Sequence, residues 1–139
     1  MRALLHLGLA QLRAGDPIAE AIDLIRQGTR LAHAAPLPAF EALGLAYEAQ
    51  ALAAARDRAA VERSRAAVAL HESARTTEWV DEICLIHARL ARDAGLDTEA
   101  AEALARARAD VQAKARRLRD PVLRSQYLAS ATARDVLAD

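Results

Sequence analysis

A chain of 139 residues is long enough to bury a hydrophobic core and usually folds as one domain. Hydrophobic residues make up 53% and charged residues 27%, a balance that excludes a disordered chain. Nineteen Lys and Arg residues match nineteen Asp and Glu residues, and this neutral balance argues against nucleic acid as the main partner.

The kind of apolar residue predicts an all-α fold. Roughly a quarter of the chain is Ala, the strongest helix former, whereas aromatic residues make up only 3%. A single cysteine, Cys84, excludes a disulfide framework and is typical of a reducing compartment. No stretch approaches the roughly 20 apolar residues that a membrane span needs. We therefore expect a soluble cytoplasmic protein that does not bind a membrane.

Helix start and stop signals recur along the chain. Gly15-Asp16-Pro17 can close one helix and begin the next, Ala35-Pro36-Leu37-Pro38 cannot lie inside a helix, and Asp120-Pro121 combines a cap with a first-turn proline. Acidic residues that follow Thr77 mark one further helix start, and Gly95-Leu96-Asp97-Thr98 marks another boundary. The helical spacing of apolar residues then predicts helices at about 2–14, 17–34, 38–55, 58–74, 77–94, 97–118 and 121–130, with a further turn from Thr132.

One predicted boundary has no glycine or proline. A single helix from Pro38 to Ala74 has the same composition as two helices that meet near Arg56-Asp57-Arg58. Because a helix of that length is rare in a small domain, we expect a turn near Asp57. Short connections then give antiparallel hairpins at about 1–34, 38–74 and 77–118, followed by a capping helix at 121–138, all in one domain over 1–139.

The first two hairpins share a pattern in their first helix. Leu4, Leu7-Gly8 and Gln11 have the same spacing as Phe40, Leu43-Gly44 and Tyr47. This pattern resembles the first helix of a tetratricopeptide repeat (TPR). We expect each glycine to let the partner helix of its own hairpin lie close, and the large residues to fill the space between hairpins. The resemblance implies a right-handed superhelical stack of about three hairpins plus the capping helix.

The third hairpin departs from this pattern, since His87-Ala88 replaces Leu-Gly and the repeat interval exceeds the usual ~34 residues. The run from Asp120 to Leu128 resembles the closing helix of helical-repeat regions in large bacterial regulators that carry an ATPase module. That resemblance implies a C-terminal scaffold or sensor segment of such a regulator. We expect its apolar residues to cover the last hairpin, as a solenoid cap must: Val122, Leu123, Tyr127 and Leu128.

No catalytic motif is present. The five glycines never cluster into a phosphate loop, and neither a Gly-x-Ser-x-Gly elbow nor a His-Glu-x-x-His helix occurs. Cys84 and His87 share a helix face, but two ligands do not form a zinc site. We therefore expect no enzyme activity, no cofactor and no metal.

The basic stretch from Arg106 to Arg119 has two interpretations. It can bind an anion or nucleic acid, or it can be the solvated face of a helix whose other side carries Leu104, Val111 and Leu118. Positive charge near a helix C-terminus is itself favourable, so the second interpretation is preferred.

Function is expected on the concave face that the first helices of the hairpins would line. Mixed charge around Leu5, Leu9 and Leu45 would suit an amphipathic helix or a short peptide. The same residues could instead be solvated, contact a second copy of the chain, or pack on a neighbouring module of a larger regulator. The sequence therefore predicts a protein-interaction scaffold, with homo-oligomerisation as the alternative, and these candidate groove residues: Arg2, Leu5, Leu9, Arg13, Glu41, Leu45, Glu48, Glu82, Arg89 and Arg92.

Overall fold

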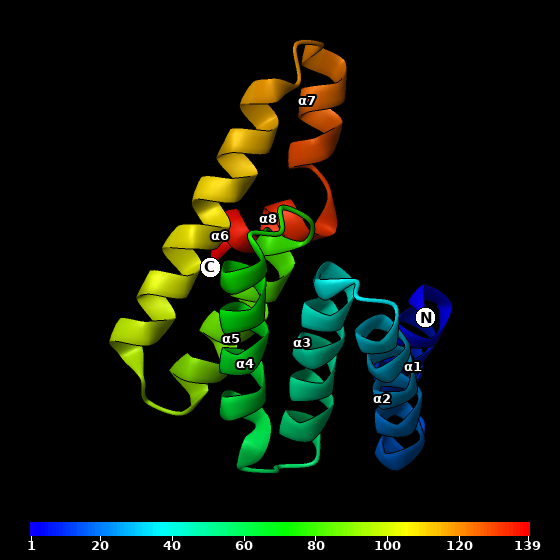
Figure 1. Cartoon of the computed structure of the whole chain (residues 1–139). Helices are drawn as coiled ribbons and strands as arrows, with labels where there is room; N and C mark the ends of the chain where they lie inside the picture. The colour runs from blue at the N-terminus through cyan, green and yellow to red at the C-terminus, as the bar shows by residue number, and fades with distance from the viewer. The chain divides into compact units, whose positions relative to one another are not determined.

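The computed structural model describes residues 1–139 and contains eight α-helices and no strand (Figure 1), which confirms the all-α prediction. The chain forms two compact units, Met1–Trp79 and Val80–Asp139. One domain over residues 1–139 remains a prediction. The helices are α1 (Arg2–Ala14), α2 (Ile18–Ala34), α3 (Pro38–Ala54), α4 (Ala59–Ala74), α5 (Val80–Asp93), α6 (Asp97–Arg117), α7 (Pro121–Leu128) and α8 (Ala131–Ala138).

The expected turn near Asp57 is confirmed, and its chemistry explains why no glycine marks it. Arg56 adopts the left-handed conformation with φ 57°, and the Asp57 N–H donates to Leu52 O over 2.9 Å. The Asp57 carboxylate then accepts a hydrogen bond from the Ala59 N–H over 2.9 Å and starts α4. An arginine therefore occupies the helix-ending position that glycine usually takes. Gly15, with φ 82°, ends α1 by the same pattern.

In the first unit, α3 packs against both α1 and α2 (Figure 1). Leu5 of α1 is fully buried, and it lies against Gly28 of α2 and Gly44 of α3. A Cβ atom at Gly28 would lie 2.8 Å from Leu5 Cδ2, and one at Gly44 would lie 3.2 Å from the same atom. The two glycines thus form a notch that Leu5 fills, and three helices meet there.

The expected role of the Leu-Gly glycines is confirmed for Gly8 only. A Cβ there would lie 2.6 Å from Ile25 Cγ1, so Gly8 lets α1 approach the partner helix of its own hairpin. The expectation was wrong for Gly44, whose nearest neighbours are Thr29 and Leu5 of the preceding hairpin. The reason is that α3 has close neighbours on two sides, and its glycine faces α2.

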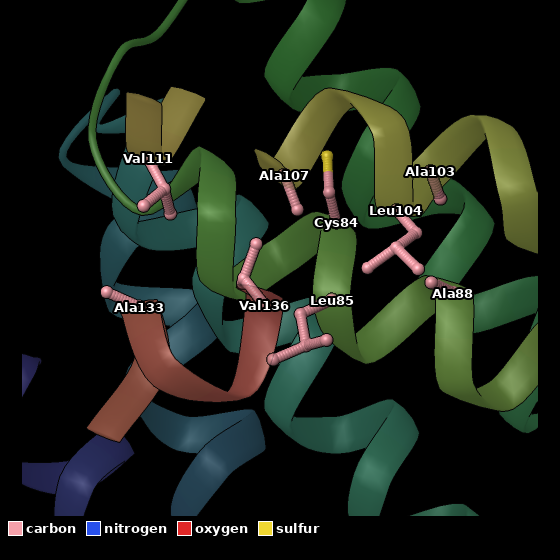
Figure 2. Close-up of a cluster of buried hydrophobic side chains, with 9 residues drawn as sticks. All are labelled: Cys84, Leu85, Ala88, Ala103, Leu104, Ala107, Val111, Ala133 and Val136. Atoms are coloured by element: carbon pink, nitrogen blue, oxygen red, sulfur yellow. The ribbon is translucent and has the colours of Figure 1, made fainter. Parts of the chain in front are cut away.

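In the second unit, α5, α6 and α8 share one buried hydrophobic cluster (Figure 2). Cys84, Leu85 and Ala88 come from α5, while Ala133 and Val136 come from α8 and are fully buried. Figure 2 shows both α8 side chains in this cluster with Val111 of α6. The sequence predicted only one further turn from Thr132. The structure has an eight-residue helix there, α8, and this helix covers the α5–α6 hairpin.

The expected capping helix over 121–138 is two helices, and its apolar face is different from the predicted one. Val122 is 62% exposed and Leu123 is 51% exposed, so neither covers the hairpin, whereas Tyr127 and Leu128 pack on the cluster. The Arg124 guanidinium donates to Leu118 O over 2.6 Å and to Ala115 O over 3.2 Å. Because these two hydrogen bonds hold the middle of α7 at the end of α6, only the last turn of α7 reaches the hydrophobic cluster.

The structure places the other helix ends within three residues of their predicted positions, with the largest difference at the start of α5, Val80 instead of 77. Asp120 caps α7 as expected, since its carboxylate accepts from the Val122 N–H over 2.8 Å. The right-handed superhelical arrangement remains a prediction. No helix in the structure combines the length and the apolar character that crossing a membrane requires.

Glycine at position 56 should stabilise the protein. An L-residue in the left-handed conformation costs roughly 1–2 kcal/mol, and the greater freedom of glycine in the unfolded chain offsets part of that gain. We expect Arg56→Gly to raise the free energy of unfolding by about 0.5–1 kcal/mol over Arg56→Ala, measured by urea denaturation with circular dichroism. Gly15→Ala should lower the free energy of unfolding, because alanine is strained at a φ of 82°. Nothing lies within 4 Å of the added Cβ, so the loss comes from the backbone alone. Equal stability of Arg56→Gly and Arg56→Ala would contradict this role of Arg56.

Candidate partner-binding surfaces

Three of the ten predicted groove residues are buried. Leu5 is 0% exposed, Leu9 is 5% exposed and Glu48 is 3% exposed, so these three cannot line an open groove. The physical reason is that α1 and α3 each pack against more than one helix, which buries a wider stripe than a single hairpin contact would. These residues belong to the core.

Glu48 connects three helices of the first unit. Its Oε1 atom lies 2.7 Å from Arg26 Nε on α2, and its Oε2 atom lies 3.5 Å from Arg63 Nε on α4. The Arg26 and Arg63 side chains are 45% and 41% exposed, so only the Glu48 charge is buried, and a lysine there would bury a positive charge between two arginines. Charge reversal at Glu48 would therefore test the fold and not a groove.

The other predicted residues of the first unit do not converge on one point. Arg2 and Arg13 are exposed, but they lie eleven positions apart in α1, a rise of about 16 Å along the helix. Glu41 is partly buried and its Oε1 atom lies 3.0 Å from His33 Nδ1, while Leu45 is partly buried in α3. A continuous groove through these residues remains a prediction.

Two of the three predicted residues in the second unit contact the amphipathic helix α8 of the same chain or its C-cap residue, Asp139. Arg89 Nε lies 3.0 Å from Asp139 Oδ2, and Arg89 Nη2 lies 3.5 Å from Asp135 Oδ2. Arg92 Nη1 lies 3.9 Å from the Asp139 carboxylate. Glu82, the third residue, is partly buried on α5.

The charges of α8 favour the protonated Arg89 guanidinium. Burial lowers the pKa of Arg89 and is the largest single influence, but the hydrogen bonds and charges of Asp139 and Asp135 together raise the pKa above its ordinary value. The α5–α6 surface thus holds α8 by two buried apolar side chains, Ala133 and Val136, and by paired charges at the rim.

The sequence reasoning missed these α8 residues, although a signal was present. Ala133 and Val136 are three residues apart, and Asp135 and Asp139 are four apart. Such spacings place the first pair on one helix face and the second pair on another, which is an amphipathic pattern. The helix is only eight residues long, too short for its period to stand out from the alanine-rich background.

A second surface is the outer cleft, a hollow of about 540 Å³ between α1 and α2. Leu7 is 50% exposed here, whereas Leu43, its equivalent in the second hairpin, is fully buried. The Gln11 Oε1 atom is buried and has no hydrogen-bond donor. The outer cleft is lined by Leu7, Gln11, Glu20, Asp23, Leu24, Gln27 and Arg30.

The only Phe and the only Trp of the chain meet in a third, smaller hollow of about 250 Å³. Their ring centroids are 4.8 Å apart at an interplanar angle of 53°. Such a tilted aromatic pair is a favourable packing arrangement. The hollow lies within the first unit and is lined by Leu37, Pro38, Ala39, Phe40, Thr76, Glu78 and Trp79.

The two residues that could have been metal ligands are both buried in α5. His87 Nε2 lies 2.9 Å from Glu99 Oε1 of α6, and Cys84 lies in the hydrophobic cluster. No group of three or more His, Cys, Asp or Glu side chains is arranged to hold a metal ion. The basic stretch is also partly engaged, because Lys114 Nζ lies 2.6 Å from Asp110 Oδ2 and 3.2 Å from Asp81 Oδ1.

Comparisons with known proteins do not extend this description. No family model matches the chain, and searches of the curated proteins and of the solved structures found no significant match.

Two side chains in the second unit should make its stability fall at alkaline pH. Burial lowers the pKa of Lys114 and is the largest single influence, but Asp110 and Asp81 outweigh it and raise the pKa above its ordinary value. Burial, and then the Asp81 charge, raise the pKa of Tyr127. In both cases the folded chain holds the proton more tightly than the unfolded chain does.

The resulting stability is fully present below the unfolded pKa, near pH 10 for both side chains, and is lost as the pH rises through the folded pKa. We expect the urea midpoint of the wild type to fall as pH rises above about 10, and to fall less steeply in Lys114→Met and in Tyr127→Phe. The slopes are measured by circular dichroism. Identical slopes in all three proteins would contradict the assignment.

Proposed function

We propose that this chain is a non-catalytic, TPR-like protein-interaction module that holds an acidic amphipathic helix against its α5–α6 face. The observation that carries this proposal is α8, which occupies that face in the chain itself. Its Ala133 and Val136 are fully buried, and its Asp135 and Asp139 pair with Arg89. A surface that holds one helix in this way can hold another of the same pattern.

The contact between α8 and the α5–α6 face is small enough for a partner helix to replace α8. Two apolar side chains of modest size are buried, and the ion pairs involve Arg89 and Arg92, whose side chains are 43% and 45% exposed. Exposed ion pairs contribute only about 0–1 kcal/mol each. However, α8 is tethered and has a high effective concentration, so a partner helix has to compete with it.

Two further observations support a scaffold of the TPR type. The shared Leu-Gly spacing of the first two hairpins resembles that repeat, and α3 packs against both helices of the hairpin before it. The resemblance of residues 120–128 to the closing helix of large bacterial regulators supports a regulatory module of the cytoplasm as its setting.

A peptide corresponding to residues 129–139 tests the proposal directly. We expect the full chain carrying Val136→Asp, in which α8 is released, to bind this peptide at least tenfold more tightly than the wild type does. Binding is followed by ¹H–¹⁵N chemical-shift changes of labelled protein, which detect weak complexes. Leu137→Asp is the matched control, because Leu137 is 43% exposed and its replacement leaves α8 docked.

The charge contact is tested in the same background. Adding Arg89→Glu to Val136→Asp should abolish peptide binding, and a peptide with Arg in place of Asp135 and Asp139 should restore it. Circular dichroism confirms that each variant is folded. Peptide binding that is indifferent to residue 89, or absent from the Val136→Asp chain, would refute the proposed function.

A further inference from the structure

The outer cleft between α1 and α2 is an open surface within its unit. The opposite face of the same hairpin, with Leu5 and Gly28, is the one that α3 covers. On the open face, Leu7 is 50% exposed, and Leu31, one helical turn after the lining residue Gln27, is 47% exposed. These apolar side chains, beside a hollow of about 540 Å³, are available for contact with another macromolecule.

The polar lining of the outer cleft indicates what kind of group it accepts. Glu20 and Asp23 place two carboxylates there, against the single guanidinium of Arg30. Gln11 adds a buried carbonyl oxygen that has no donor in its own chain. Two carboxylates against one guanidinium give the lining a net charge of −1, which suits a partner that brings arginine side chains next to apolar ones.

The chain itself carries a surface of that composition at the other end of its sequence. Val122 and Leu123 in the first turn of α7 are 62% and 51% exposed. Residues 106–124 contain seven basic and two acidic residues, a net charge of +5. Three exposed arginines of this stretch directly precede α7: Arg116, Arg117 and Arg119.

The exposed turn of α7 is held rigidly. The Asp120 carboxylate caps its first N–H groups, and Arg124 ties the helix to the carbonyl groups of Leu118 and Ala115 at the end of α6. A surface fixed in this way loses little conformational freedom when it binds. The first turn of α7 therefore presents two exposed apolar side chains just after three exposed arginines of the chain.

We propose that copies of this chain associate head to tail, with α7 of one copy docking in the outer cleft of the next. Val122 and Leu123 pack against Leu7 and Leu24, and the arginines before α7 approach Glu20 and Asp23. The two surfaces differ, so the interface is heterologous and can extend beyond a dimer.

The contact involves few apolar side chains and exposed charges, so the association is reversible and weakens with added salt. The average mass from sedimentation equilibrium should therefore rise with concentration, up to about 1 mM, and fall when salt is added. Each of two variants should remain monomeric: Leu7→Asp, which blocks the cleft, and Val122→Asp/Leu123→Asp, which blocks α7. All three positions are at least half exposed, so both variants keep the fold, which circular dichroism checks.

Mixing the two variants gives the sharpest result. The Leu7→Asp chain keeps an intact α7 and the other variant keeps an intact cleft, so the mixture should form a one-to-one dimer and nothing larger. Glu20→Lys/Asp23→Lys should behave like Leu7→Asp. A wild type that is monomeric at all concentrations would overturn the proposal. So would a mixture that stays monomeric, or self-association that survives in either variant alone, which would indicate a symmetric interface.

The experiment is independent of the peptide test. Neither variant changes Arg89 or α8, so helix binding at the α5–α6 face can hold or fail without affecting the mass of the assembly. The two proposals therefore stand or fall separately.

Discussion

Close approach of α1, α2 and α3 around Leu5 is the contact on which the first unit depends. Leu5 is fully buried and fills the notch that Gly28 and Gly44 leave open. With only 3% aromatic residues, the chain has few large side chains to fill wide gaps, so its helices must lie close together. Glycine and alanine at the helix contacts permit this close approach. Glu48 then pairs α3 with Arg26 of α2 and with Arg63 of α4.

The local chemistry of helix ends made most of the fold predictable. Gly15, the prolines near position 36 and the Asp120-Pro121 cap act on neighbouring residues only, so they can be recognised in one sequence. Even the Asp57 turn follows from a local cap, although Arg56 takes the place of glycine. Helix length was therefore predictable to within a few residues.

Contacts between distant residues were not predictable in the same way. The groove set was wrong at Leu5, Leu9 and Glu48 because their burial depends on how many helices surround α1 and α3. The direction of α7 depends on the bonds of Arg124 to the end of α6, and Val122 is exposed as a result. Arg89 was among the residues chosen for the groove, and the structure shows it paired with the acidic residues of α8.

Both proposed surfaces accept a short helix that combines apolar side chains with charge. The α5–α6 face presents Arg89 to carboxylates, whereas the outer cleft presents Glu20 and Asp23 to arginines. Opposite charge at the two surfaces would keep α8 and α7 from exchanging places, because a like charge at either site is unfavourable.

The stability of Gly44→Ala tests the packing account most directly. At an ordinary helix position this change stabilises a protein by up to about 1 kcal/mol, because alanine is the better helix former. Here a Cβ would be forced against Thr29 and Leu5, so we predict a loss of about 1–3 kcal/mol in urea denaturation, and a smaller loss in a Thr29→Ala background. A Gly44→Ala protein that is more stable than the wild type would contradict the close approach of α2 and α3.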